Sequence, residues 1–123
     1  MSSLSISKRQ VGDVYILDLD GKILLGETNR QLNEAIYELI AEGKNRVVLN
    51  LEKVTAIDSS GLGEIVAGFS TLVKAGGTLK LVNMPSRVTD IMTVTKLYTV
   101  FDVYDTEADA VNSFDQDDVT AAA

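Results

Sequence analysis

The feature that most constrains this chain is a strand pattern that passes directly into a helical pattern. Residues 47–51 are almost continuously β-branched or aliphatic, which predicts a buried strand, and the pattern extends through residues 52–57. Apolar residues then recur at helical spacing until residues 76–77, two glycines that end the run. The apolar positions are Leu62, Ile65, Val66, Phe69, Leu72 and Val73. The two patterns together place residues 58–60 at a helix start.

Asp58, Ser59 and Ser60 occupy this predicted helix start. A helix start exposes backbone N–H groups that lack partners, and it carries the positive end of the helix dipole. Asp and Ser are among the preferred N-cap residues, so capping alone would account for the cluster. The position could instead present a serine hydroxyl in a field that favours negative charge. Both interpretations are open at this point.

Composition argues against several classes of function. The chain has 123 residues, which suits one domain, and its net charge of −7 opposes binding to nucleic acid or to an anionic membrane. No apolar run approaches the roughly 20 residues that span a bilayer, and no secretory signal pattern begins the chain. Cysteine is absent, so a disulfide framework is excluded and a cytoplasmic location is expected.

The sequence lacks residue types that enzymes commonly use for catalysis. Without His or Cys, the chain cannot form a Ser-His-Asp triad, a Cys-His pair or an ordinary zinc site. Carboxylates could still hold Mg²⁺, and the sequence leaves that possibility open. Because His and Cys are absent, we nevertheless expect a protein that is not an enzyme and that uses no cofactor or metal.

Strands and helices are predicted to alternate, which indicates an α/β domain over residues 1–114. We expect a mixed, mostly parallel sheet of about five strands, with an N-terminal antiparallel hairpin and four covering helices. Residues 115–123 are acidic and then rich in Ala, which predicts a disordered tail. The strand patterns cover residues 4–8, 14–20, 47–57, 78–83 and 100–104, and the helical patterns follow Thr28, Ser60, Pro85 and Thr106.

The order of elements and residues 54–63 together resemble a STAS domain, in particular a bacterial anti-sigma factor antagonist. The most specific part is a hydrophobic strand end followed by Asp-Ser-Ser-Gly-Leu-Gly at 58–63. The likeness covers residues 4–114, and residues 74–81 resemble the family's helix exit and next strand. In that family the antagonist binds an anti-sigma factor that is also a serine kinase, and this binding frees the sigma factor.

The resemblance also implies roles for individual residues. The family's kinase phosphorylates the hydroxyl residue directly after the Asp, which here is Ser59. The phosphorylated antagonist releases its partner, and a separate phosphatase resets it. The partner-binding residues implied in this way are Asp58, Ser59, Ser60, Gly61 and Leu62. Spacing alone does not choose between Ser59 and Ser60.

Leu24 departs from the family pattern. Many members end the second strand with Gly, any residue, an aliphatic residue and Asp, whereas residues 21–24 are Gly-Lys-Ile-Leu. That Asp lies near the phosphorylation site in the family fold. Its loss leaves open a STAS scaffold that binds a regulatory partner without being switched, or a Leu24 that merely adds to a buried edge.

A small nucleotide- or phosphate-binding domain is a further alternative. Gly61 and Gly63 after a strand are similar to the start of a dinucleotide fingerprint, but the third glycine would fall at Val66. The Gly-Lys-Ser/Thr of a phosphate loop is absent as well. A receiver-type phospho-aspartate at Asp58 ranks lower, because its acidic pair would have to follow a strand, whereas Asp18 and Asp20 lie inside one.

Overall fold

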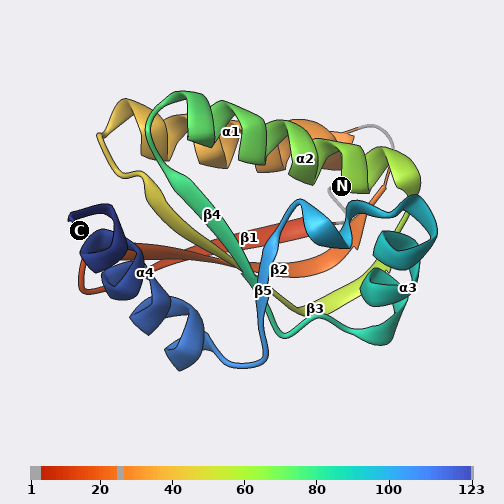
Figure 1. The fold of residues 1–123 in the computed structure, drawn as a ribbon. Coiled ribbons are helices and arrows are strands. Elements are labelled where there is room, and N and C mark those ends of the chain that lie inside the picture. Colours follow the sequence, from red (N-terminus) through yellow and green to blue (C-terminus); the bar gives the residue numbers. More distant parts are fainter. Residues whose placement is uncertain (1–3, 25–26, 123) are drawn as a thin grey trace.

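A computed structural model describes residues 4–24 and 27–122. One sheet runs through the molecule in the order β1-β2-β3-β4-β5, with β1 antiparallel to β2 and all other pairs parallel (Figure 1). The strands are β1 Leu4–Val11, β2 Val14–Ile23, β3 Arg46–Ile57, β4 Thr78–Val82 and β5 Asp102–Tyr104. The helices are α1 Glu27–Ala41, α2 Ser59–Lys74, α3 Ser86–Thr95 and α4 Glu107–Ala122, with a short 3-10 helix at Leu97–Thr99. The predicted α/β class and order of elements are confirmed.

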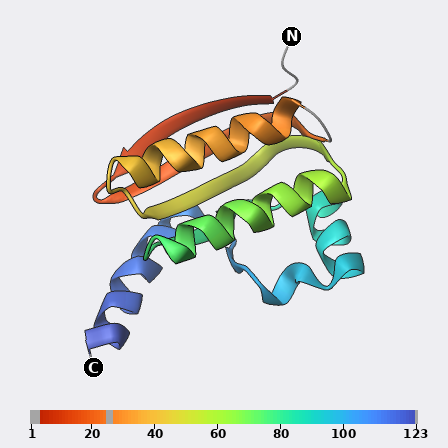
Figure 2. The ribbon, with the colours of Figure 1, turned by 90° about the horizontal axis from the view of Figure 1, so that it is seen from above.

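Helices cover the two faces of the sheet unequally. Helices α1 and α2 lie side by side over one face, whereas α4 packs on the other (Figures 1 and 2). The alternation of β2 explains this, because Leu17 and Leu19 enter the large core beneath α1 and α2, while Val14 and Ile16 face α4. The smaller core beneath α4 consists of Val14, Ile16, Val48, Val82, Ala110 and Phe114.

Lys80 is buried in the smaller core. The side chain has 0% exposure, its Nζ donates a hydrogen bond to Ser113 Oγ at 2.6 Å, and it lies 4.3 Å from the centre of the Phe114 ring. Hydrogen bonding and a cation–π contact offset part of the cost of removing an ammonium group from water. Lys80 therefore joins α4 to β4.

Two helices differ in length from the sequence prediction. Helix α1 begins at Glu27, one residue before the predicted cap Thr28, whose side chain lies outside the described residues. Helix α4 begins directly after its predicted cap, Thr106, whose Oγ1 accepts a hydrogen bond from the Asp109 N–H at 3.1 Å. The helix continues past Phe114 to Ala122. Alanine is the strongest helix former, which favours this extension. The boundary at residue 114 and the disorder of 115–123 stay predictions, and residue 123 is not described.

The carboxyl ends of three strands lie together at one end of the sheet. Because β2, β3 and β4 are parallel, their carboxyl ends lie on the same side of the molecule. Ile23, the last residue of β2, pairs with Ile57, the last residue of β3. Ligands and partners of open α/β sheets often bind at such an end. Among the described residues, no helix is long and apolar enough to cross a membrane.

Candidate functional site

Asp58 links β3 to α2 and caps the helix. Its backbone is extended, with φ −116° and ψ 179°, and its Oδ1 accepts a hydrogen bond from the Gly61 N–H at 2.7 Å. The backbone oxygen of Asp58 also accepts from the Leu62 N–H at 2.9 Å. The capping interpretation is therefore correct for Asp58. Removal of such a cap typically costs about 1 kcal/mol of stability.

Gly61 allows the helix start to rest on the end of β2. A Cβ atom at Gly61 would stand 1.9 Å from the backbone oxygen of Ile23 and 2.7 Å from its carbonyl carbon. The same Ile23 oxygen accepts a long hydrogen bond of 3.4 Å from the Asp58 N–H. The close approach at Gly61 is thus made by the protein's own backbone.

Ser59 and Ser60 are the exposed part of this helix start. Within residues 4–24 and 27–122, neither serine hydroxyl has a hydrogen-bond partner. Gly61 is buried, and Leu62 is 1% exposed and belongs to the large core. Of the five residues implied as a partner surface, Asp58, Ser59 and Ser60 reach the surface, whereas Gly61 and Leu62 lie beneath it.

Leu24 borders the site from β2. It follows Ile23 directly, and the pairing of Ile23 with Ile57 brings the residue after β2 alongside Asp58. The Leu24 side chain is half-buried. Leu24 thus follows the strand end that supports the helix start, at the position where the resemblance led us to expect an acid.

Helix α3 is a neighbour of the site that the sequence patterns did not indicate. It lies beside the start of α2 in both views (Figures 1 and 2), and Pro85 forms its N-cap. The Arg87 guanidinium donates a hydrogen bond to the Thr55 backbone oxygen, which ties α3 to β3 shortly before Asp58. Val94 on α3 is 81% exposed. The single proline could have indicated this neighbour in the sequence. It separates α3 from β4 near the carboxyl ends of the strands.

Two exposed hydroxyl groups and a capped helix start define what this site can do chemically. Glu64, in the second turn of α2, accepts a hydrogen bond from the Asn33 amide of α1, so its carboxylate is held by the fold. Within the described ranges, no group of three or more acidic residues is placed to hold a metal ion. The whole chain has no His or Cys to activate a serine hydroxyl. An exposed hydroxyl at the positive end of a helix dipole can receive a phosphate from another enzyme.

The sequence matches a known domain family. The family model of the STAS domain matches residues 5–110. A protein of Thermotoga neapolitana, provisionally named as an anti-sigma factor antagonist, is 34% identical over 102 residues, which are 82% of this chain and 89% of that protein. The anti-sigma F factor antagonist of Paenibacillus polymyxa is 27% identical over 116 residues, 92% of this chain and 97% of its own.

A solved structure shares the fold over nearly the same length. The crystal structure of a protein from Thermotoga maritima, also provisionally named as an anti-sigma factor antagonist, superposes with a TM-score of 0.80 at 27% identity. The match covers 88% of this chain and 92% of the other. The five-stranded mixed sheet, its N-terminal antiparallel pair and its four helices are therefore those of the STAS fold.

Proposed function

This chain belongs to the STAS domain family, and from that membership we propose that it is an anti-sigma factor antagonist. In this role it binds an anti-sigma factor in the cytoplasm and so frees a sigma factor. The observation that carries the proposal is the exposed pair Ser59 and Ser60 at a capped helix start. A net charge of −7 fits a protein partner better than nucleic acid or an anionic membrane.

Ser59 is the proposed phosphorylation site, and the anti-sigma factor is its serine kinase. Ser59 is the first residue of α2, directly after the cap Asp58. A phosphate there would sit at the positive end of the helix dipole, which favours negative charge by roughly 0.3–1 kcal/mol. The fold should therefore accept the modification. Ser60 is also exposed, and it serves as the matched alternative acceptor.

The phosphate acts on the interface rather than on the fold. A phosphoserine carries about −1.5 to −2 charges at pH 7, and at Ser59 this charge would lie next to Asp58. A docked partner would remove water from both groups, which is costly unless new donors replace it. A loss of about 2.7 kcal/mol would weaken the complex about a hundredfold. A separate phosphatase would then restore the binding form.

Asp58, Ser59 and Ser60 form the proposed contact surface, and two buried residues support it. Gly61 and Leu62 set the position of the first turn of α2 relative to β2 and the core. They would contribute to partner binding by holding Asp58 and the serines in place. The chain itself is proposed to be a ligand and a substrate, not an enzyme.

A STAS scaffold that is not switched is the second candidate, and Leu24 is the observation that favours it. A half-buried apolar residue follows the strand end that supports the helix start, in place of the family's acid. An apolar contact there could strengthen a permanent complex without serving a kinase. The two candidates differ in one measurable property, which is phosphate transfer to the chain.

The test is copurification of partners from the native cytosol with and without ATP, followed by intact-mass analysis of this chain. The switch predicts one added phosphate, which Ser59→Ala abolishes and the control Ser60→Ala retains. Ser59→Ala should stay bound in ATP, and Ser59→Asp should bind weakly. Complete absence of phosphate would favour the scaffold, and phosphate on Ser60 alone would show that Ser59 is the wrong acceptor. Phosphate on Ser59 with unchanged affinity would refute the switch.

The absence of catalysis has its own test. The pure chain should show no hydrolysis of nucleoside triphosphates above the buffer rate. Hydrolysis that Asp58→Ala abolishes would instead identify an active site at the start of α2.

A further inference from the structure

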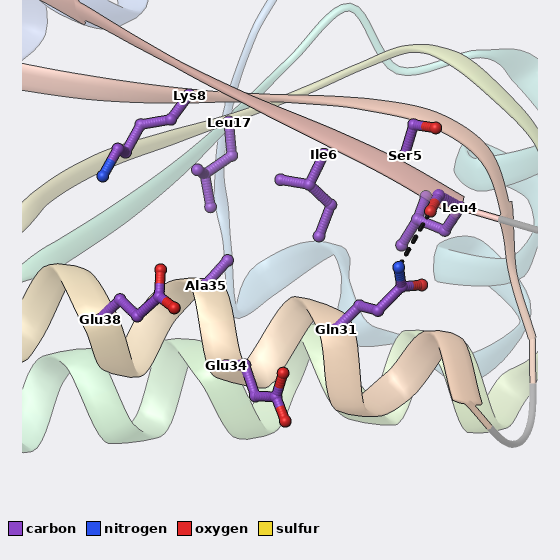
Figure 3. Close-up of a pocket in the computed structure, with 9 residues that line it drawn as sticks. All are labelled: Leu4, Ser5, Ile6, Lys8, Leu17, Gln31, Glu34, Ala35 and Glu38. Atoms are coloured by element: carbon purple, nitrogen blue, oxygen red, sulfur yellow. Dashed lines mark hydrogen bonds between the residues drawn. The ribbon is translucent and has the colours of Figure 1, made fainter. Parts of the chain in front are cut away.

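A groove between β1 and α1 lies outside the site at the start of α2 (Figure 3). It has a volume of about 540 Å³. Its apolar part is formed by Leu4, Ile6 and Leu17 from the sheet and by Ala35 from the helix. One end is closed by Gln31, whose Nε2 donates a hydrogen bond to the Leu4 backbone oxygen at 3.2 Å. The groove therefore has an apolar floor and a polar rim.

Strand β1 forms one wall of the groove and is also an edge of the sheet. It pairs with β2 from Leu4 to Val11 without a register shift, so its outer edge is regular. An edge strand directs part of its backbone N–H and C=O groups away from its neighbour, where another chain can pair with them. A regular edge beside a groove with an apolar floor is an arrangement that can bind an extended segment as an added strand.

Two carboxylates give the opposite wall its charge. Glu34 and Glu38 are exposed on α1 and four residues apart; in Figure 3 the Glu38 carboxylate lies on the β1 side of the helix, whereas the Glu34 carboxylate points away from β1. Neither carboxylate has an ion pair or a hydrogen bond with any of the residues that the structure describes. Lys8, at that end of the groove, pairs instead with Glu42 at 3.8 Å. Like charges at this spacing destabilise a helix slightly, and a cation placed between them would reverse the effect.

We propose that this groove and the edge of β1 bind an extended segment of a partner protein. The segment carries apolar residues at alternate positions and one Lys or Arg between them. Its apolar side chains lie against Ile6 and Ala35, and its cation reaches Glu38, with the exposed Glu34 one helical turn away. A second copy of this chain fits less well, because each copy brings a net charge of −7 and its own acidic wall. The site is independent of the serines at the start of α2.

The probe is the capped peptide Thr-Val-Thr-Lys-Thr-Val-Thr, titrated into the full-length chain labelled with ¹⁵N. We expect saturable NMR shifts of the amides of β1 and α1, and no shifts at Ser59 or Ser60. A matched peptide with Glu in place of Lys should bind far more weakly. Absence of saturation at millimolar Lys peptide, equal shifts with the Glu peptide, or shifts centred on α2 would overturn the proposal.

Charge variants of the chain test the acidic wall directly. Glu34→Gln combined with Glu38→Gln should weaken peptide binding about fivefold or more, in line with the loss of exposed ion pairs. Glu52→Gln, an exposed acid on β3 away from the groove, is the control and should bind as the unaltered chain does. Equal affinity of the double variant and the control would refute the charge contact. A dimer in sedimentation velocity, with shifts on the same strand, would assign the edge to a second copy and overturn the proposed occupant.

Discussion

The backbone oxygen of Ile23 occupies the space that a side chain on Gly61 would need. A Cβ at Gly61 would stand 1.9 Å from this oxygen, well inside any non-bonded contact. The obstacle is backbone, held in place by the pairing of Ile23 with Ile57, so it cannot turn aside as a flexible side chain can. The glycine after the serines is thus required by the contact between α2 and β2.

Gly61→Ala should destabilise the protein by about 1–3 kcal/mol, the usual cost of overpacking. Gly63→Ala is a matched control in the same helix, since a Cβ at Gly63 meets nothing within 4 Å. That control should gain up to about 1 kcal/mol, because Ala is the better helix former. Urea unfolding of both variants measures the difference. Equal stability of the two variants would contradict the close contact at Ile23.

Ser59→Asp should leave the protein folded and slightly more stable. An acid in the first turn of α2 interacts favourably with the helix dipole, by roughly 0.3–1 kcal/mol at low ionic strength. Ser59→Lys, with the opposite charge at the same exposed position, should lower the melting temperature. The order Asp above Ser above Lys is the expected result of thermal unfolding at low salt. A large fall for Ser59→Asp would show that the fold does not tolerate charge there.

Deletion of residues 115–123 should change the melting temperature little. Among the α4 side chains whose burial the structure describes, residues 107–115, the buried ones are Ala110, Ser113 and Phe114, and all three precede the cut. Phe114→Ala is the contrasting variant, and it should cost about 3–5 kcal/mol because it empties the centre of the smaller core. Calorimetry of both proteins separates the two effects. If the deletion costs as much as Phe114→Ala, the end of α4 is part of the folded domain.

Asp18 should make stability depend on acid pH. The hydrogen bond from Arg9 is the main cause that lowers the pKa of Asp18, and the hydrogen bond from the Asn50 amide adds to it. Since the folded-state pKa lies below the unfolded one, the carboxylate stabilises the fold above about pH 4, its ordinary unfolded value. This contribution is lost as pH falls through the lower, folded-state pKa.

Asp18→Asn should therefore lower stability at pH 7 by up to about 1 kcal/mol, as expected for an ion pair near the surface. The difference from the unaltered chain should shrink as the pH is lowered below about 4. Urea unfolding at pH 7 and at acid pH measures both effects. Asp20→Asn, an exposed acid on the same strand, should show a smaller change at pH 7. If the difference in unfolding free energy between Asp18→Asn and the unaltered chain does not change with pH, the charge of the carboxylate is not the cause of that difference.

Local patterns in the sequence were sufficient for the elements and their faces. The alternation of β2 and β4 places Leu17 and Leu81 in one core and Ile16 and Val82 in the other, as the structure shows. The cap at Asp58 also follows from local preference, because a strand pattern ends where a helical one begins.

Contacts between distant segments could not be predicted in this way. The position of the Ile23 oxygen depends on the register between β2 and β3, which shifts twice, between Asp18 and Asp20 and again between Gly21 and Lys22. Periodicity reports which face a residue belongs to and carries no information on such shifts. The burial of Lys80 depends likewise on α4, which crosses the sheet from far along the chain. The helix start at Asp58 could therefore be predicted from the sequence, but its support from β2 could not.

The strands of the sheet lie in the same order as they occur in the chain. Each new strand therefore adds beside the one synthesised before it, and no strand has to be inserted between two that are already paired. Pairing between sequence neighbours keeps the loops to be closed short, which favours rapid folding. As the chain leaves the ribosome, β1 to β3 and α2 can assemble before β5 and α4 exist. The start of α2 can then form its contact with β2 early, before α4 has been synthesised to cover the opposite face of the sheet.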